Sequence, residues 1–337
     1  MRNFLRKNWF GIATIAVSAA VLSLAVYNTG GTALIKAAAA LGKGWLAAAF
    51  GLALVYWALE TLTLNILTRT KAPGYRYRYS FRSGMIGLLY SALTPFATGG
   101  QPMQIYDMSR TGISAGDAGS VITVKSIIYQ AALIVFGVVT FFAGNRFFSG
   151  KIERLNPLVV WGFFSNMIFI LCVVLVCVRP GVTKAAARVV IAALSKARLI
   201  KDEEAASARV AKEIAVFHGS VPAFRDRPLT VVIAVLTTFA ELFVYYSIPY
   251  CVYRSFDLRA AALWDMVSAN ALIALISAFF PLPGGSGAAE GSFYLFFGLF
   301  FPAELILFAT LIWRAATYYS CIAAGMLVSF TGGKTPR

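Results

Sequence analysis

Long apolar stretches separated by shorter polar segments dominate this chain. Six of them reach the roughly 20 residues that a helix needs to cross a hydrocarbon core about 30 Å thick. They are Phe10–Tyr27, Trp45–Leu67, Val121–Phe142, Leu158–Val178, Leu229–Val252 and Ala303–Phe330. The pattern therefore predicts an all-α polytopic membrane protein with six full spans.

Two further apolar stretches run into breaks that are rich in glycine and proline. Met85–Thr98 meets the sequence T-P-F-A-T-G-G-Q-P at Thr94–Pro102, and Val267–Leu282 meets F-P-L-P-G-G-S-G-A-A-E-G at Phe280–Gly291. Broken backbone at membrane depth is tolerated only where it is buried in protein or lines a wet cavity. Paired breaks in the two halves of a membrane protein are typical of a transport site.

The distribution of basic residues predicts how these two segments lie. If Met85–Thr98 crossed the membrane, the ten basic residues of the loop Arg179–Arg227 would face outside. If it enters and leaves on the cytoplasmic side, 20 of the 30 basic residues face the cytoplasm, as the positive-inside rule requires. We therefore expect two re-entrant hairpins, Met85–Met108 and Val267–Phe297, that open to opposite faces as in an inverted repeat. Both termini are expected in the cytoplasm.

The same reasoning predicts one transmembrane domain over residues 1–337. Its halves, 1–178 and 228–337, are joined by a cytoplasmic segment, 179–227, with two amphipathic stretches at Thr183–Leu199 and Asp202–Phe217. This segment is either a solvated helical hairpin or an interfacial helix that binds anionic lipid.

The amino-acid composition indicates which kinds of partner this protein has. Hydrophobic residues make up 59% of the chain and charged residues 13%, whereas a soluble domain carries about 25% charge. The excess of 30 Lys and Arg over 14 Asp and Glu lies in loops, so it indicates topology and anionic lipid rather than nucleic acid. The four cysteines lack metal-ligand spacing and His218 is the single histidine, so we expect no metal and no cofactor.

Ionisable residues inside apolar stretches are expensive and usually have a function. The candidates are Glu60, Asp107, Lys125, Glu241, Asp265, Glu290, Glu304 and Arg314. Glu60 could serve only a structural pair, Lys125 could extend to the interface, and Asp265 and Glu304 lie near segment ends. Arg314 needs an anionic partner, which is either Glu290 or Glu241, or a lipid phosphate.

The glycine pairs fit beside these charges. Free backbone N–H groups at the start of a helix form an anion site, and Pro102 suits an early helical position. We therefore predict a substrate site without catalytic residues. Its residues are Gly99, Gly100, Gln101, Gln104, Asp107, Lys125, Glu241, Gly284, Gly285, Glu290 and Arg314.

Two motifs carry a resemblance to a known family. P-x-P-G-G-x-G-x-x-E at Pro281–Glu290, followed by Arg314, and T-P-x-A-T-G-G-Q-P-x-Q at Thr94–Gln104, followed by M-S-R-x-G-I-S at Met108–Ser114, resemble the flippase-like integral membrane family. That family includes the transmembrane region of lysylphosphatidylglycerol synthases, and the resemblance covers essentially the whole chain.

The sequence also departs from that family. Many members carry G-E-x-x-R where Gly100–Gln104 reads G-Q-P-M-Q, and a Glu-Arg pair where Val124-Lys125 stands, so the first site is less charged here. The soluble aminoacyl-transferase domain of the bifunctional synthases is not expected in this chain, which argues against an enzyme acting alone.

The resemblance implies translocation of a phospholipid, such as phosphatidylglycerol or its lysyl ester, across a bacterial cytoplasmic membrane. A separate lipid-modifying synthase or a second copy of the chain is the implied partner. Two alternatives stay open: a phosphatidylglycerol lysyltransferase, and an ion-coupled transporter of a small anion that uses Glu241 or Glu290 as a proton site.

Overall fold

The computed structural model describes residues 41–143, 156–196, 202–277 and 288–331, and within these ranges the regular structure is entirely helical. Five helical stretches there are long and apolar enough to cross a membrane: Lys43–Thr68, Ala115–Phe142, Val160–Val178, Pro228–Ser255 and Ala303–Phe330. They match five of the six predicted spans. The sixth, Phe10–Tyr27, lies outside the described residues.

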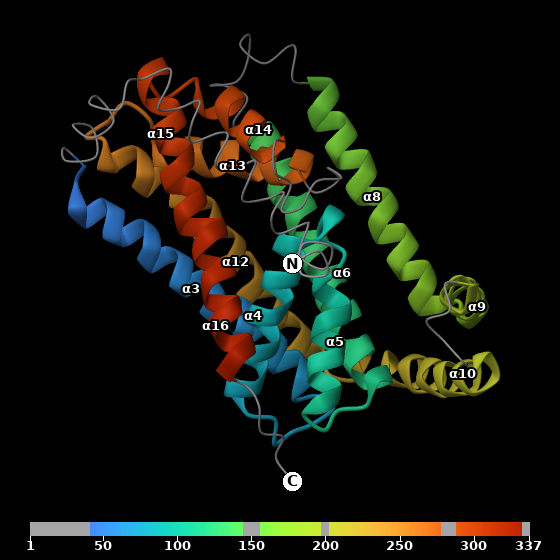
Figure 1. Cartoon of the computed structure of the whole chain (residues 1–337). Coiled ribbons are helices and arrows are strands. Elements are labelled where there is room, and N and C mark those ends of the chain that lie inside the picture. The colour runs from blue at the N-terminus through green and yellow to red at the C-terminus, as the bar shows by residue number, and fades with distance from the viewer. Residues whose placement is uncertain (1–40, 144–155, 197–201, 278–287, 332–337) are drawn as a thin grey trace.

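Two long antiparallel helices form the centre of the structure. They are α3 (Lys43–Thr68) and α12 (Pro228–Ser255), which lie side by side in Figure 1. At one end the Gly42 N–H donates to the Ser255 carbonyl at 2.8 Å. Toward the other end the Thr63 hydroxyl donates to that of Thr237 at 2.9 Å. Helix α6 (Ala115–Ala143) packs against both.

The first predicted hairpin is a pair of short helices. Helix α4 (Tyr77–Leu93) is followed by a 3-10 turn, η1 (Pro95–Ala97), and by α5 (Gly100–Arg110), which packs back along α4. At 1.5 Å per residue these helices are about 25 Å and 16 Å long, so each falls short of a hydrocarbon core about 30 Å thick.

Small residues let the two helices of this hairpin come close together. A Cβ atom added at Gly100 would lie 1.9 Å from the Ser91 hydroxyl oxygen and 2.6 Å from the Gly87 carbonyl oxygen. A side chain within the break satisfies one of its backbone groups: the Thr94 hydroxyl accepts a hydrogen bond from the Gly99 N–H at 2.8 Å. The prediction that the Gly99 N–H points freely toward a ligand is therefore wrong.

Asp107 has a structural position in the same hairpin. Its buried carboxylate lies 3.2 Å from the Arg82 guanidinium and accepts the Ser83 hydroxyl at 2.7 Å, and both partners belong to α4. It is absent from the lining of the cavity described below. Asp107 lies one helical turn after Gln104, which is why the sequence predicts it among the substrate residues, but its side chain turns toward α4.

The second predicted hairpin also consists of two short helices packed together, α13 (Leu263–Ser277) and α14 (Ala288–Phe297). Its tip, with Gly284 and Gly285, lies outside the described residues. Helix α4 begins near the C-terminal end of α3. Helix α13 begins near the C-terminal end of α12, which lies beside the N-terminal end of α3. The hairpins thus enter the bundle from opposite ends (Figure 1). Their depth in a bilayer stays a prediction.

The long polar segment folds as the two amphipathic stretches predict. Helix α9 (Pro180–Lys196) pairs with α10 (Glu203–Ser220), and the short α11 (Pro222–Arg225) leads into α12. Helix α10 docks on the start of α6: Glu213 accepts the Gly116 N–H at 2.6 Å and Ser220 donates to Asp117 at 2.5 Å. This segment is therefore a packed helical hairpin at one end of the bundle.

The remaining spans flank this core. Helix α8 (Asn156–Val178) leads into α9 and exposes large apolar side chains such as Trp161, Phe164 and Leu171. The last span is made of α15 (Ala303–Arg314), a π-helical stretch η3 (Ala315–Tyr319) and α16 (Ser320–Thr331), which packs against α4.

The close approach of α4 and α5 yields a stability prediction. Gly100→Ala should lower the free energy of unfolding by about 1–3 kcal/mol, because the new methyl group overlaps the Gly87 carbonyl, a backbone atom that cannot rotate away. Thermal unfolding of the detergent-purified protein measures this. Gly51→Ala is the matched control, since nothing lies within 4 Å of its added Cβ. Equal unfolding temperatures for the two variants would contradict the expectation.

Candidate functional site

A cavity of about 670 Å³, with a mostly apolar lining that also carries charged and polar side chains, lies where the two hairpins meet the long helices. The first hairpin contributes Gly87, Ser91 and the stretch Phe96–Thr98, and the second contributes Ala274 and Ser277 at the end of α13. The walls come from α3, α6, α12 and the last span. Both hairpins therefore reach one shared cavity from opposite ends of the bundle.

Three long helices each bring a charged residue and a tyrosine to this cavity, four positions apart. Residues four apart share one face of a helix, one turn from each other. The pairs are Tyr56 and Glu60 on α3, Lys125 and Tyr129 on α6, and Glu241 and Tyr245 on α12. Because α3 runs antiparallel to α12, Tyr56 lies level with Tyr245, and their ring centroids are 4.9 Å apart.

The three charged side chains form one cluster. Lys125 Nζ lies 2.5 Å from Glu60 Oε1 as a hydrogen-bonded ion pair. Glu241 interacts electrostatically with both Glu60 and Lys125. Glu60 and Glu241 are only 5% and 1% exposed, and Glu241 Oε1 has no hydrogen-bond partner among the described residues. Lys125 lies ten residues into α6, about 15 Å along its axis, so the cluster is far from the helix ends.

The wall formed by the first hairpin is polar but uncharged. Gln101, in the first turn of α5, donates to the Ser126 hydroxyl on α6 at 2.9 Å, and the amide of Gln104 is buried beside it. The tip is conformationally unusual, because Phe96 and Ala97 have φ values of 53° and 55°. Such left-handed conformations are uncommon outside glycine and cost about 1–3 kcal/mol each.

Side chains from other spans pair backbone carbonyls at the end of each hairpin's first helix. The Tyr318 hydroxyl donates to the Ala92 carbonyl at the end of α4, at 2.9 Å. Asn166 on α8 donates to the Leu275 carbonyl at the end of α13, at 3.2 Å, and also accepts a hydrogen bond from Gln130 of the cavity wall. The last carbonyls of a helix lack intrahelical partners, so the Tyr318 bond stabilises the end of α4. The Asn166 bond ties the last described turn of α13 to α8.

Arg314 lies next to this cavity wall rather than in it. The residue is 5% exposed, and its guanidinium stacks on Trp313 and Tyr318, 5.1 Å and 4.9 Å from the ring centroids. It also interacts electrostatically with Tyr245 of the cavity. The π-helical stretch that begins after Arg314 carries Thr317 and Tyr318, which line the cavity. Stretches of this kind inside α-helices are frequent at functional sites.

The predicted site residues divide into three groups. Gly100, Gln101, Gln104, Lys125 and Glu241 line the cavity together. Gly99, Asp107 and Arg314 do not line it; Arg314 was placed there because its charge lies inside a span, but aromatic rings cover its guanidinium. Gly284, Gly285 and the side chain of Glu290 lie outside the described part of the chain, so the predicted pairing of Arg314 with Glu290 is not tested.

Sequence reasoning missed several lining residues. Glu60 is among the ionisable candidates but not among the predicted site residues, and Tyr56, Tyr129, Tyr245 and Gln130 are not predicted at all. A signal for most of them exists in the sequence, because three predicted spans each place a tyrosine four residues from an ionisable group. That repeated spacing marks one face on each helix.

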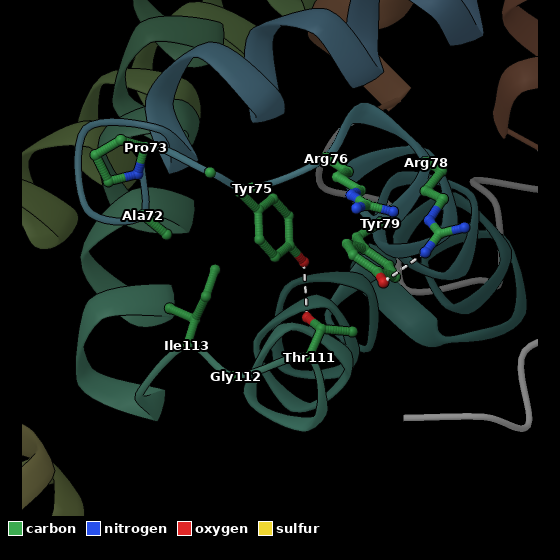
Figure 2. A pocket seen from close by; sticks show the side chains of 10 residues that line it. Ala72, Pro73, Tyr75, Arg76, Arg78, Tyr79, Thr111, Gly112 and Ile113 are labelled. Carbon is green, nitrogen blue, oxygen red and sulfur yellow. Dashed lines mark hydrogen bonds between the residues drawn. The ribbon is translucent and has the colours of Figure 1, made fainter. Parts of the chain in front are cut away.

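A second, separate pocket of about 450 Å³ lies at the end of the bundle where α3 and α5 finish (Figure 2). The Tyr75 hydroxyl meets that of Thr111 at 2.8 Å, and burial raises the pKa of Tyr75. The Arg78 guanidinium donates to the Tyr79 hydroxyl at 2.8 Å, and Arg76 lies on the same rim. Its arginines suit an anion at the helix ends.

No group of three or more His, Cys, Asp or Glu residues that could hold a metal ion occurs within the described ranges. The polar chemistry of the cavity therefore rests on the charged cluster and on amide and hydroxyl groups.

Comparison with known proteins places the chain in a family. A UPF0104 membrane protein from Archaeoglobus fulgidus is 23% identical over 287 residues, which cover 84% of each chain. No solved structure matches the chain significantly. The family model described as the lysylphosphatidylglycerol synthase transmembrane region matches residues 11–325, nearly the whole sequence. The chain therefore belongs to the family of the lysylphosphatidylglycerol synthase transmembrane region, and it is an all-α, multi-pass membrane protein.

Proposed function

We propose that this protein translocates a phospholipid with an anionic or aminoacylated headgroup across the membrane. The headgroup passes through the polar cavity while the acyl chains stay in the bilayer. The observation that carries the proposal is the charged cluster of Glu60, Lys125 and Glu241, buried far from the helix ends in a cavity that both hairpins reach. An ion that enters hydrocarbon alone meets an idealised cost of order 20 kcal/mol, which a polar route lowers.

The dimensions of the cavity support a headgroup as cargo. Its volume of about 670 Å³ lies within the usual range of small-molecule sites, about 300–1,000 Å³. The lining combines charged groups with neutral amides and hydroxyls, as a headgroup with phosphate and hydroxyl groups requires. The family description names a lipid synthase region, which favours a phospholipid of the phosphatidylglycerol or lysyl-phosphatidylglycerol type.

Each side of the cavity suits one part of such a headgroup. Lys125, 14% exposed, is the cation available to a phosphate. Gln101, Gln104 and Ser126 can bind glycerol hydroxyls. The Glu60 and Glu241 carboxyl groups suit the ammonium of an aminoacyl group. The arginines of the second pocket, Arg76 and Arg78, would collect anionic headgroups at the membrane surface.

The alternatives are weaker. A transporter of small free anions has no support beyond the cavity itself, whereas the description of the matching family names a lipid synthase region. A lysyltransferase activity needs a site for an aminoacyl donor, which the headgroup cavity does not resemble. We further propose that residues 1–337 act as one domain in the bacterial cytoplasmic membrane, with a separate synthase or a second copy as partner.

Loss of the cavity cation should stop transport. Lys125→Met combined with Glu60→Gln removes both charges of the ion pair and leaves Glu241, a carboxyl group that can become neutral by binding a proton, so the variant is expected to fold. Translocation of headgroup-labelled phosphatidylglycerol in reconstituted vesicles should fall about 10- to 100-fold, the value of a charged hydrogen bond worth about 1.5–3 kcal/mol.

The control for this experiment is Lys212→Met, which removes an exposed lysine on α10. This variant should translocate the labelled lipid at the same rate as the wild-type protein. Wild-type rates in the double variant, with unaltered elution from a gel-filtration column, would refute the assigned role of the cavity. Formation of lysylated lipid by the purified chain would instead favour the transferase alternative.

The predicted topology has its own test. Single cysteines at Lys212 on α10 and at Arg259 in the loop before α13 lie at opposite ends of the bundle. In intact cells, a membrane-impermeant maleimide should label position 259 and spare position 212, because the basic loops are expected to face the cytoplasm. Labelling of position 212 from outside would show that the topology is the inverse of the predicted one.

A further inference from the structure

The charged cluster of the cavity has an uneven charge count. Glu60, Lys125 and Glu241 come from three different helices, and one ammonium group serves two carboxyl groups. If both glutamates are ionised, the cluster keeps one uncompensated negative charge. An uncompensated charge away from water is strongly unfavourable, and such a group neutralises instead by binding a proton.

The other groups around Glu241 do not supply the missing positive charge. The titratable neighbours are tyrosines: Tyr56 from α3, Tyr129 from α6, and Tyr245 and Tyr246 from α12 itself. The last span brings Cys321 to the cavity, and its Arg314 acts on Tyr245. Helix α13 lines the cavity with Ala274 and Ser277, which carry no charge. Lys125 is therefore the one cation that lines the cavity among the described residues.

We propose that the Glu60–Glu241 pair binds one exchangeable proton beside Lys125 and that this proton is the coupling ion of transport. The inference rests on the proposed function. In the resting cluster one carboxylate pairs with Lys125 and the second carboxyl group carries the proton, so the net charge is zero. Glu241 shares a side-chain hydrogen bond with Glu60, and a hydrogen bond between two carboxyl groups needs a proton on one of them, because an ionised carboxylate can only accept.

Headgroup binding and proton binding are linked through Lys125. When a lipid phosphate draws the ammonium toward the cavity, the two carboxyl groups lose part of their positive partner and hold the proton more strongly. The proton binds from water on the side where the headgroup binds, and it is held while Lys125 is drawn to the phosphate. When the headgroup leaves on the other side and Lys125 pairs again with Glu60, the proton is held less strongly and passes to water there. The next proton then binds on the first side and restores the neutral resting cluster. Anionic headgroup and proton therefore move together, so a proton gradient drives translocation.

A spectroscopic experiment tests the proton site without any transport. Infrared difference spectra of the purified protein across a pH titration should show the C=O band of a protonated carboxylic acid at neutral pH. Glu241→Gln and Glu60→Gln should each remove this band, since either change leaves one carboxylate for one ammonium group. Glu204→Gln, an exposed position on α10, should keep it. A wild-type spectrum without the band, or a band that persists in both cavity variants, would overturn the proton site.

A transport experiment tests the coupling. Vesicles that contain the protein and headgroup-labelled phosphatidylglycerol receive an imposed pH gradient, and a pH dye follows the lumen. The gradient should raise the translocation rate several-fold, with proton entry that Glu241→Gln abolishes and Glu204→Gln keeps. Translocation that ignores the pH gradient, or follows a sodium gradient instead, would overturn the coupling. If the infrared band is present but lipid never moves, the proposed function fails and the proton site stands.

Discussion

The requirement that a buried charge be compensated organises the centre of this protein. Three charged side chains, Lys125, Glu60 and Glu241, lie on three different helices, far from the water at either end of the bundle. Each of them can be buried there only beside the other two. This fixes the rotation of α3, α6 and α12 about their axes, and with it the face on which their tyrosines lie. The first hairpin then closes against α6 through Gln101 and Ser126, which makes the charged face one wall of a cavity.

A second constraint acts on the backbone. A helix that stops inside a membrane leaves carbonyl groups without partners, and no water is available in hydrocarbon to pair them. Tyr318 binds the Ala92 carbonyl at the end of α4, and Asn166 binds the Leu275 carbonyl in the last described turn of α13. Each partner belongs to a full span outside the hairpin. Hairpin depth and span position are thereby tied together in both halves.

The sequence predicts the elements of this fold better than it predicts their side-chain partners. Span lengths and the two Gly-Pro breaks are local properties, so five spans and the helix pairs α4–α5, α13–α14 and α9–α10 agree with the structure, while the depth of the hairpins stays a prediction. Partners are not local. Asp107 and Lys125 both looked available to substrate, yet Arg82 holds one in the hairpin while Glu60 brings the other to the cavity. Only the packing of α4 against α5 and of α6 against α3 separates these two roles.

The tip of the first hairpin is the part of the cavity best suited to move. Phe96 and Ala97 are held in left-handed conformations, which persist only while the surrounding contacts outweigh their strain. Those contacts are few and polar: Thr94 with Gly99, and Gln101 with Ser126. Under the proposed function, a headgroup that offers its own hydroxyl or phosphate oxygen to Gln101 would replace the Ser126 bond and free the tip from α6. The strained backbone then lowers the cost of rearrangement, whereas Asp107 keeps the base of the hairpin fixed on Arg82. A rigid base with a strained tip lets one short segment change the access of the cavity without moving the spans.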